Sequence, residues 1–165
     1  MNFMLRSQAH PHASALRKGR VSESGRIYSV TTVTHERECV FEDFRASRLL
    51  VSTLRWLNEN SRIASIAYMI MPDHLHWIFT LNEPFTLSAI MHSLKTHSAI
   101  EINRYLCTSG RLWQPGFHDH ALRTEADLST MIRYIVTNPV RARLVNDICD
   151  YSHWDISGLE PFMGW

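Results

Sequence analysis

Hydrophobic side chains stand at every second position along residues 74–81, at Leu75, Trp77, Phe79 and Leu81, and alternate with His74, His76, Ile78 and Thr80. Successive side chains of a strand point to opposite faces, so Leu75 and Trp77 would lie on one face, and His74 and His76 on the other. The alternation predicts a strand with one face against a hydrophobic core. Both imidazoles would then project side by side from its other face.

Other segments also carry strand or helix patterns. Residues 27–35 are rich in β-branched side chains, and residues 63–71 are nearly all apolar, as in a strand that is buried on both faces. A fourth strand over 112–123 contains Pro115 and Gly116, so it would be an edge strand or one broken by a bulge. Helical spacing of apolar residues predicts helices over 44–60, over 86–106 with Gly110 ending it, and from the capping-box pair Thr124 and Asp127 to Asn138-Pro139, followed by a short helical piece over 140–145.

The order of these elements is that of the split βαβ, or ferredoxin-like, arrangement (βαββαβ). This arrangement puts the third strand, residues 74–81, in the middle of the sheet. The first two helices would cover its Leu75 face, and an additional C-terminal helix, which carries Tyr134, would cover the histidine face. The predicted fold class is therefore α+β, a ferredoxin-like sheet with one extra helix.

The His74 and His76 pair is a candidate metal site. Two neutral imidazoles on a rigid strand, just after a Pro72-Asp73 turn, can hold one divalent ion and leave positions open for a substrate. Such an ion needs a third ligand from elsewhere in the chain. A His-X-His triplet also arises by chance in a chain with ten histidines, so the spacing alone does not decide the matter.

Tyr134 and Asn138 are four residues apart, and an unbroken helix would stack them on one face. A phenol there could act as a nucleophile beside a cation, and Asn138 could give the ion an oxygen ligand. Structural roles compete with both assignments. Tyr134 could be a packing residue at the core boundary, and Asn138 before Pro139 also fits a helix N-cap.

Chain length and net charge limit the possible domain organisation and the possible nucleic-acid surface. The 165 residues are enough for one domain that folds on a hydrophobic core of its own. Seventeen Lys and Arg residues are nearly balanced by sixteen Asp and Glu residues, which leaves a net charge of +1. A nucleic-acid surface would therefore be a local patch, and the basic residues near the start of the chain and near residues 133–143 allow one.

The three cysteines, Cys39, Cys107 and Cys149, form no CxxC pair. Their odd number indicates a reducing compartment in place of a disulfide framework or a zinc site. The sequence shows no signal peptide and no apolar run long enough to span a bilayer. We therefore expect a cytoplasmic protein without a membrane partner.

Three motifs occur in the order found in one family. His74-Leu75-His76, preceded by Met71-Pro72-Asp73, resembles the His-hydrophobic-His motif of the HUH single-tyrosine transposases. The segments around Trp113-Gln114-Pro115 and over Tyr134 to Val140 are similar to the WQP strand and the YIxxNPV segment of the REP-associated tyrosine transposases. As a set the motifs are specific, and they cover residues 27–144.

The resemblance implies a metal-dependent nuclease and strand-transferase that acts on single-stranded DNA at hairpins of palindromic repeats. Tyr134 would attack the scissile phosphate and form a 5′-phosphotyrosine link. The ion, Mg²⁺ or Mn²⁺, would be bound by His74, His76 and Asn138. His120 would be a neighbour of the active site, and DNA would be contacted by Arg17, Lys18, Arg20, Arg123 and Arg141.

The resemblance also favours a monomer, although some single-tyrosine transposases are dimers that share their tyrosine helices. The predicted division is a basic N-terminal arm over 1–26, a nuclease domain over 27–145 and a C-terminal tail over 146–165, packed on that domain. His118 departs from the family pattern, since it makes a second histidine pair with His120. We expect His118 at the surface, with an alternative metal site as the other interpretation.

Two other functions fit parts of the sequence. A non-catalytic nucleic-acid-binding module on the same fold could use the histidine face to contact bases, and would have no use for a metal. A two-histidine RNA phosphoesterase would need a Ser or Thr two residues after each catalytic histidine. His74 is followed at that spacing by His76 instead, which disfavours this class.

Overall fold

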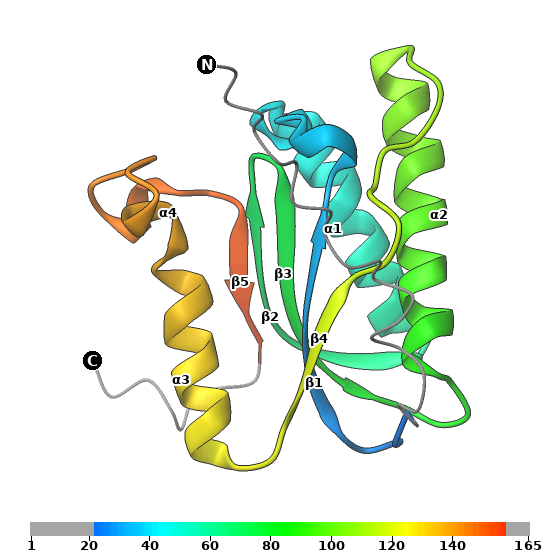
Figure 1. Ribbon diagram of the computed structural model, residues 1–165, viewed down its shortest axis with the longest axis vertical. Helices are drawn as coiled ribbons and strands as arrows, with labels where there is room; N and C mark the ends of the chain where they lie inside the picture. Colours follow the sequence, from blue (N-terminus) through cyan, green and yellow to red (C-terminus); the bar gives the residue numbers. More distant parts are fainter. Residues whose placement is uncertain (1–21, 158–165) are drawn as a thin grey trace, which may run out of the picture.

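The computed structural model describes residues 22–157, and Figure 1 shows their arrangement. A five-stranded antiparallel sheet has the strand order β4-β1-β3-β2-β5. Helices α1 and α2 lie on one side of this sheet and α3 lies on the other (Figure 1). The elements are β1 (Ile27–Val33), α1 (Phe44–Glu59), β2 (Ile63–Met71), β3 (His74–Leu81), α2 (Leu87–Leu106), β4 (His118–Leu122), α3 (Glu125–Val136), α4 (Asn138–Arg141) and β5 (Trp154–Ile156).

The predicted fold class is confirmed, with β3 at the centre of the sheet. Leu75, Trp77 and Phe79 are fully buried toward α1 and α2. The Trp77 indole N–H donates to the Ser65 hydroxyl at 3.0 Å, so the one polar atom of this side chain is satisfied. Burial of these large side chains fixes which face of β3 is the core face, since a slip of one residue would expose all of them.

The predicted strand over 112–123 is wrong in its first half, because only His118–Leu122 is a strand. Trp113 makes a single bridge to Thr34 and is otherwise a packing residue: its ring lies 5.4 Å from that of Phe41, and its indole N–H donates to Ser98. The Lys95 ammonium donates to the carbonyls of Gln114 and Gly116. Because these carbonyls accept hydrogen bonds from a side chain of α2 and not from a neighbouring strand, the segment over 112–117 stays irregular.

Some residues at the helix ends differ from the sequence-based expectations. α2 ends at Leu106, as expected, but the residue that stops it is Cys107, which takes the left-handed conformation (φ 53°), and not Gly110. Asn138 is the first residue of α4 and follows the cap residue Thr137, so it is not the N-cap. α4 covers Asn138–Arg141, where the short helical piece was expected over 140–145. The capping box of Thr124 and Asp127 is confirmed.

The short strand β5 was not predicted. It pairs with β2 through Ala67, Tyr68 and Met69, and Trp154 packs against the hydrophobic cluster beneath α3. The division into arm, domain and tail stays a prediction, and Phe162 and Trp165, expected to pack on the domain, lie outside the described residues. Among the helices of residues 22–157, none is long and apolar enough to cross a membrane.

Candidate active site

The two imidazoles of β3 converge on one point. The Nε2 atoms of His74 and His76 are 3.1 Å apart, and the rings are perpendicular (89°) with centroids 4.8 Å apart. Two ligand atoms at right angles on an ion about 2.1 Å from each would lie roughly 3 Å apart. The pair therefore has the spacing of two adjacent ligands of one ion.

The outer nitrogen of each ring has its own partner. Nδ1 of His74 lies 2.5 Å from Oδ1 of Asp73, and Nδ1 of His76 lies 2.8 Å from the hydroxyl oxygen of Thr31. Thr31 is directly opposite His76 in the β1–β3 ladder. A carboxylate can only accept, so His74 carries a proton on Nδ1, and in the neutral ring the lone pair is on Nε2. Histidines that bind metals are held in this way.

Burial, then the positive charges of His74 and Arg141, lowers the pKa of His76 to about 4. This imidazole is therefore neutral near pH 7, as a metal ligand must be. Burial acts to raise the pKa of Asp73, but hydrogen bonds and charge from His74 and Arg37 outweigh it and hold that pKa below its usual value. Asp73 is thus a carboxylate that accepts from His74, next to a neutral His76.

Tyr134 lies beside the histidines although it is 58 positions after His76 in the chain. Its ring centroid is 6.4 Å from that of His76, with the ring planes at 79°. The Arg141 guanidinium covers the Tyr134 ring at 4.5 Å, in cation–π geometry. The phenol is 47% exposed, so a substrate can reach it. Helix α3 places it there because Leu128, Ile132 and Ile135 bury the neighbouring stripe of the helix against the sheet.

Asn138 follows Tyr134 by one helical turn and is half-buried. Its amide nitrogen is buried and, in the part of the chain that the structure describes, has no hydrogen-bond partner. Within residues 22–157 no cluster of three His, Cys, Asp or Glu side chains could hold a metal. A third ligand would therefore be of another type, and a carboxamide with an unsatisfied buried atom fits that need. Rotation of the amide exchanges its oxygen and nitrogen.

The second histidine pair lies on the same face but further away. His118 and His76 are both opposite Thr31, one on each side of β1, so two strand spacings, about 10 Å, separate their backbones. His120 is opposite Ser29, two residues further along β1. Both side chains are exposed, as expected for His118. His120 is thus on the face of the site without a described contact to His74 or His76.

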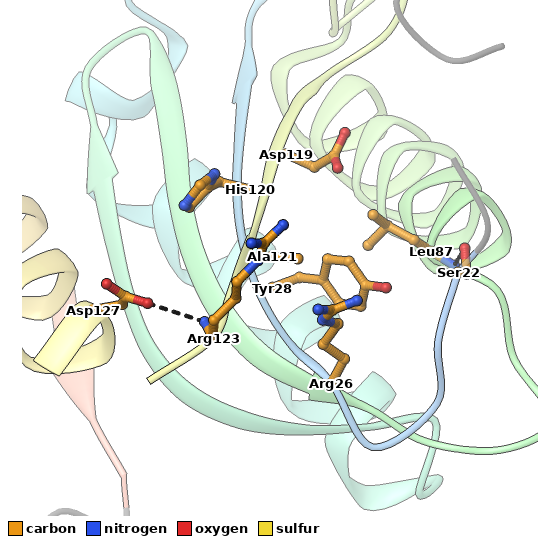
Figure 2. A pocket seen from close by; sticks show the side chains of 9 residues that line it. All are labelled: Ser22, Arg26, Tyr28, Leu87, Asp119, His120, Ala121, Arg123 and Asp127. Carbon is orange, nitrogen blue, oxygen red and sulfur yellow. Dashed lines mark hydrogen bonds between the residues drawn. The ribbon is translucent and has the colours of Figure 1, made fainter. Parts of the chain in front are cut away.

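A cavity of about 430 Å³ lies at the β4 edge, between β1, β4 and the start of α2. Figure 2 shows Arg26, Arg123 and Asp119 around it, with His120 on the opposite side of β4. The backbone N–H of Arg123 donates to Asp127. The Arg123 guanidinium points toward the cavity (Figure 2). Arg123 is therefore beside this cavity, while Arg141 is at the tyrosine. Arg17, Lys18 and Arg20, predicted to bind DNA, lie outside the described residues.

Thr31 and Arg37 contribute to the site, but the sequence patterns did not single them out. Thr31 stands beside His76 only because of the β1–β3 register. The Arg37 guanidinium donates to Oδ2 of Asp73 at 2.8 Å. A cross-strand partner can be found from sequence only when the register is known, and alternation does not give it. Arg37 lies in a short 3-10 turn with no periodic pattern.

Comparison with known proteins identifies this chain as a transposase-family protein. The sequence profile of the IS200-like transposases matches residues 23–138, and the chain belongs to this family. It is 31% identical over 101 residues to the REP-associated tyrosine transposase of Escherichia coli K12, and 29% identical over 105 residues to a putative one of Haemophilus influenzae Rd. The first match covers 58% of each chain, and the second covers 58% of this chain and 60% of that relative, so the chain spans less than two thirds of either relative.

Two solved structures share the fold. A structure of a REP-associated tyrosine transposase bound to a REP hairpin has a TM-score of 0.70 at 23% identity, and the match covers 82% of this chain and 79% of that one. A putative transposase from Deinococcus radiodurans R1 has a TM-score of 0.52 at 22% identity, covering 72% and 95%. The resemblance that the three motifs indicated is confirmed.

Proposed function

We propose that the protein is a metal-dependent single-stranded DNA endonuclease and strand-transferase, which acts at hairpins of palindromic repeats through a covalent link to Tyr134. The observation that carries this proposal is the position of Tyr134, 6.4 Å from the His76 ring, where two imidazole nitrogens converge. A nucleophile and a candidate metal site are thus brought to one exposed point from distant parts of the chain.

The reaction exchanges one phosphodiester for another. The Tyr134 oxygen bonds to the scissile phosphorus, the bond from phosphorus to the 3′-oxygen breaks, and the phenol proton is recovered overall on the 3′-hydroxyl. Neither water nor a nucleotide is consumed. Attack by that hydroxyl on the phosphotyrosine reverses the reaction, and attack by a different 3′-hydroxyl transfers the strand. Arg141, above the phenol, would hold its ring and place a positive charge beside the phosphate.

A Mg²⁺ or Mn²⁺ ion bound by His74, His76 and Asn138 would stabilise the negative charge that develops on the phosphate. The donor set fits, because the two Nε2 atoms converge and the Asn138 amide has an unsatisfied buried atom. The three groups come from one strand and from the start of α4, and they leave coordination positions open for phosphate oxygens.

The DNA would extend from the tyrosine along the α3 side of β4, past His120 to Arg123. The cavity at the β4 edge could take an unpaired nucleotide at the foot of the hairpin. Ser22, the first described residue, lines this cavity. We propose that Arg17, Lys18 and Arg20 of the predicted basic arm also contact the DNA. The related protein of known structure is bound to a REP hairpin.

We also propose an oligomeric state and a compartment for the protein. We expect a monomer, since Tyr134 already lies beside the His76 ring of its own chain. The three cysteines are free and exposed, which suits the reducing cytoplasm.

The test is covalent capture of DNA. The full chain is incubated with Mn²⁺ and a hairpin oligonucleotide from repeats that flank its gene, and the products are separated under denaturing conditions. Wild type should form an adduct that mass spectrometry places on Tyr134. Tyr134→Phe should form none, while Tyr105→Phe, a matched change on α2, should behave as wild type. Hairpin binding without any wild-type adduct would contradict the proposal and favour a non-catalytic binding module.

A further inference from the structure

We propose that Asp73 and Thr31 are positioning residues that set the tautomers of His74 and His76, and that binding of a metal ion moves the His76 proton from Nε2 to Nδ1. The inference rests on the proposed metal site. Asp73 would fix His74 permanently in its ligand form, whereas Thr31 would allow His76 two forms. Neither residue would itself touch the substrate.

The four side chains form one chain of hydrogen bonds before an ion binds. In its neutral form His74 donates from Nδ1 to Asp73, and its Nε2 can then only accept. Two nitrogens 3.1 Å apart cannot both present lone pairs to each other without repulsion, so His76 must donate from Nε2 to His74. Nδ1 of His76 then accepts, and the Thr31 hydroxyl is its donor. The donors therefore run in one direction, from Thr31 through His76 and His74 to Asp73.

An ion between the two Nε2 atoms requires both lone pairs. His76 must then carry its proton on Nδ1, and Thr31 must turn its hydroxyl to accept it. The imidazole stays neutral in both states, so one proton leaves Nε2 to solvent, one is taken up at Nδ1, and none is released overall. A hydroxyl suits this role because it is both donor and acceptor, which neither a carboxylate nor an aliphatic side chain is.

Hydrogen bonds to its backbone and to its carboxylate fix the position of Asp73. Its carbonyl accepts from both the backbone N–H and the hydroxyl of Thr34, each at 2.9 Å, and its second carboxylate oxygen accepts from Arg37. Glu36 and Arg37 both have positive φ (52° and 58°), an uncommon conformation for side chains of this kind. Strained backbone persists where surrounding contacts enforce it, and here those contacts lead to the histidine pair.

The first test measures affinity for Mn²⁺ alone by electron paramagnetic resonance, on the full chain without DNA. Loss of an outer partner of a ligating histidine costs about 10–100-fold in metal affinity. Thr31→Val and Asp73→Ala should lose this much, and Thr31→Ser should recover wild-type affinity. Thr80→Val, a matched change on the same face of β3 away from the histidines, should have no effect. Wild-type affinity in both Thr31→Val and Asp73→Ala would overturn the inference.

The second test reads the tautomers directly. Long-range ¹H–¹⁵N spectra of metal-free protein should show His74 protonated at Nδ1 and His76 at Nε2. On addition of Zn²⁺, a diamagnetic ion that imidazole binds well, the His76 proton should appear at Nδ1. A His76 that carries its proton on Nδ1 before the ion is added would overturn the switch.

These tests are separate from the test of the proposed function, because they use no DNA. Wild type that forms the DNA adduct, but whose Thr31 and Asp73 variants bind Mn²⁺ normally, would remove the positioning role and leave the transposase chemistry. If the Mn²⁺ affinities and the tautomers are as expected but the wild type forms no DNA adduct, the positioning role stands and the transposase chemistry is removed.

Discussion

The two faces of the central sheet have opposite properties, and strand β3 belongs to both. On one face Leu75, Trp77 and Phe79 are fully buried under α1 and α2. On the other face the next residues along, His74 and His76, are only partly buried and carry hydrogen-bonded polar groups. Because successive side chains of a strand point to opposite faces, one face of β3 contributes to stability and the other carries the proposed chemistry.

The α3 face is itself divided along its length. Toward one end, Ile78 packs with Ile132 and Ile135 and keeps α3 on the sheet. Toward the end where β3 begins, Thr31, His76 and Tyr134 replace apolar side chains. The helix is thus anchored by its hydrophobic part, and this anchoring holds the half-exposed tyrosine at the histidines. Substitutions on the two faces should consequently have different kinds of effect.

The largest effect is expected on the closed face. Trp77→Ala removes a fully buried side chain and should lower the free energy of unfolding by about 3–5 kcal/mol. Denaturant unfolding measures the loss. The fraction that remains folded should still bind Mn²⁺, because the histidines point the other way. A stable Trp77→Ala protein that cannot bind Mn²⁺ would contradict the division of the two faces.

Substitution of His76, next to Trp77 on β3, should affect activity strongly and stability only slightly. His76→Ala should reduce the rate of DNA adduct formation by about 10²–10³-fold, the usual cost of removing an electrostatic contributor to a transition state. Its effect on unfolding should be about 1 kcal/mol, the value of the lost hydrogen bond to Thr31. Single-turnover kinetics with the hairpin oligonucleotide give the rate. Full activity after this substitution, or in EDTA, would exclude a metal on β3.

A smaller effect is expected where the chain crosses the β2 edge. The Tyr151 hydroxyl donates to the Ile70 carbonyl at 2.7 Å, and burial raises its pKa to about 12. Since this folded pKa is above the ordinary value of about 10, its contribution to stability is complete below pH 10 and is lost as pH rises toward 12. Absorbance titration should show one phenol ionising near pH 12, and Tyr151→Phe should remove it. An unchanged titration would contradict the burial of this hydroxyl.

The smallest effects concern the helix caps, one on each face. Thr124→Ala removes the cap of α3, and Thr86→Ala removes that of α2, where each hydroxyl accepts a backbone N–H. Each should cost about 1 kcal/mol of unfolding free energy. Thermal melts compare the two variants directly. Caps with no measurable effect would mean that packing alone sets where these helices begin.

Much of this arrangement could be predicted from sequence. Alternation identified β3 and its two faces, because burial of Leu75 and Trp77 follows directly from their period. The helix starts at Thr86 and Thr124 follow from local hydrogen bonds that a few residues can satisfy. The fold class followed from the order of the elements. These features depend on short-range chemistry or on a repeated pattern.

The errors have long-range causes. Trp113 looked like a strand residue, yet it is held by Phe41 and Ser98, contacts that no local pattern encodes. Strand β5 has only three residues and forms because β2 offers an open edge. The partnership of Thr31 with His76 depends on strand register. The roles proposed for Tyr134, Asn138, Arg123 and Arg141 stay predictions, and the structure adds the positions of these four residues.

The most direct test of the central claim is the position of a bound ion. Crystals of the full chain soaked in Mn²⁺ should show an anomalous difference peak about 2.2 Å from Nε2 of both His74 and His76, on the side of the Tyr134 phenol. A peak at His118 and His120, or no peak at the two β3 histidines at saturating Mn²⁺, would contradict the account.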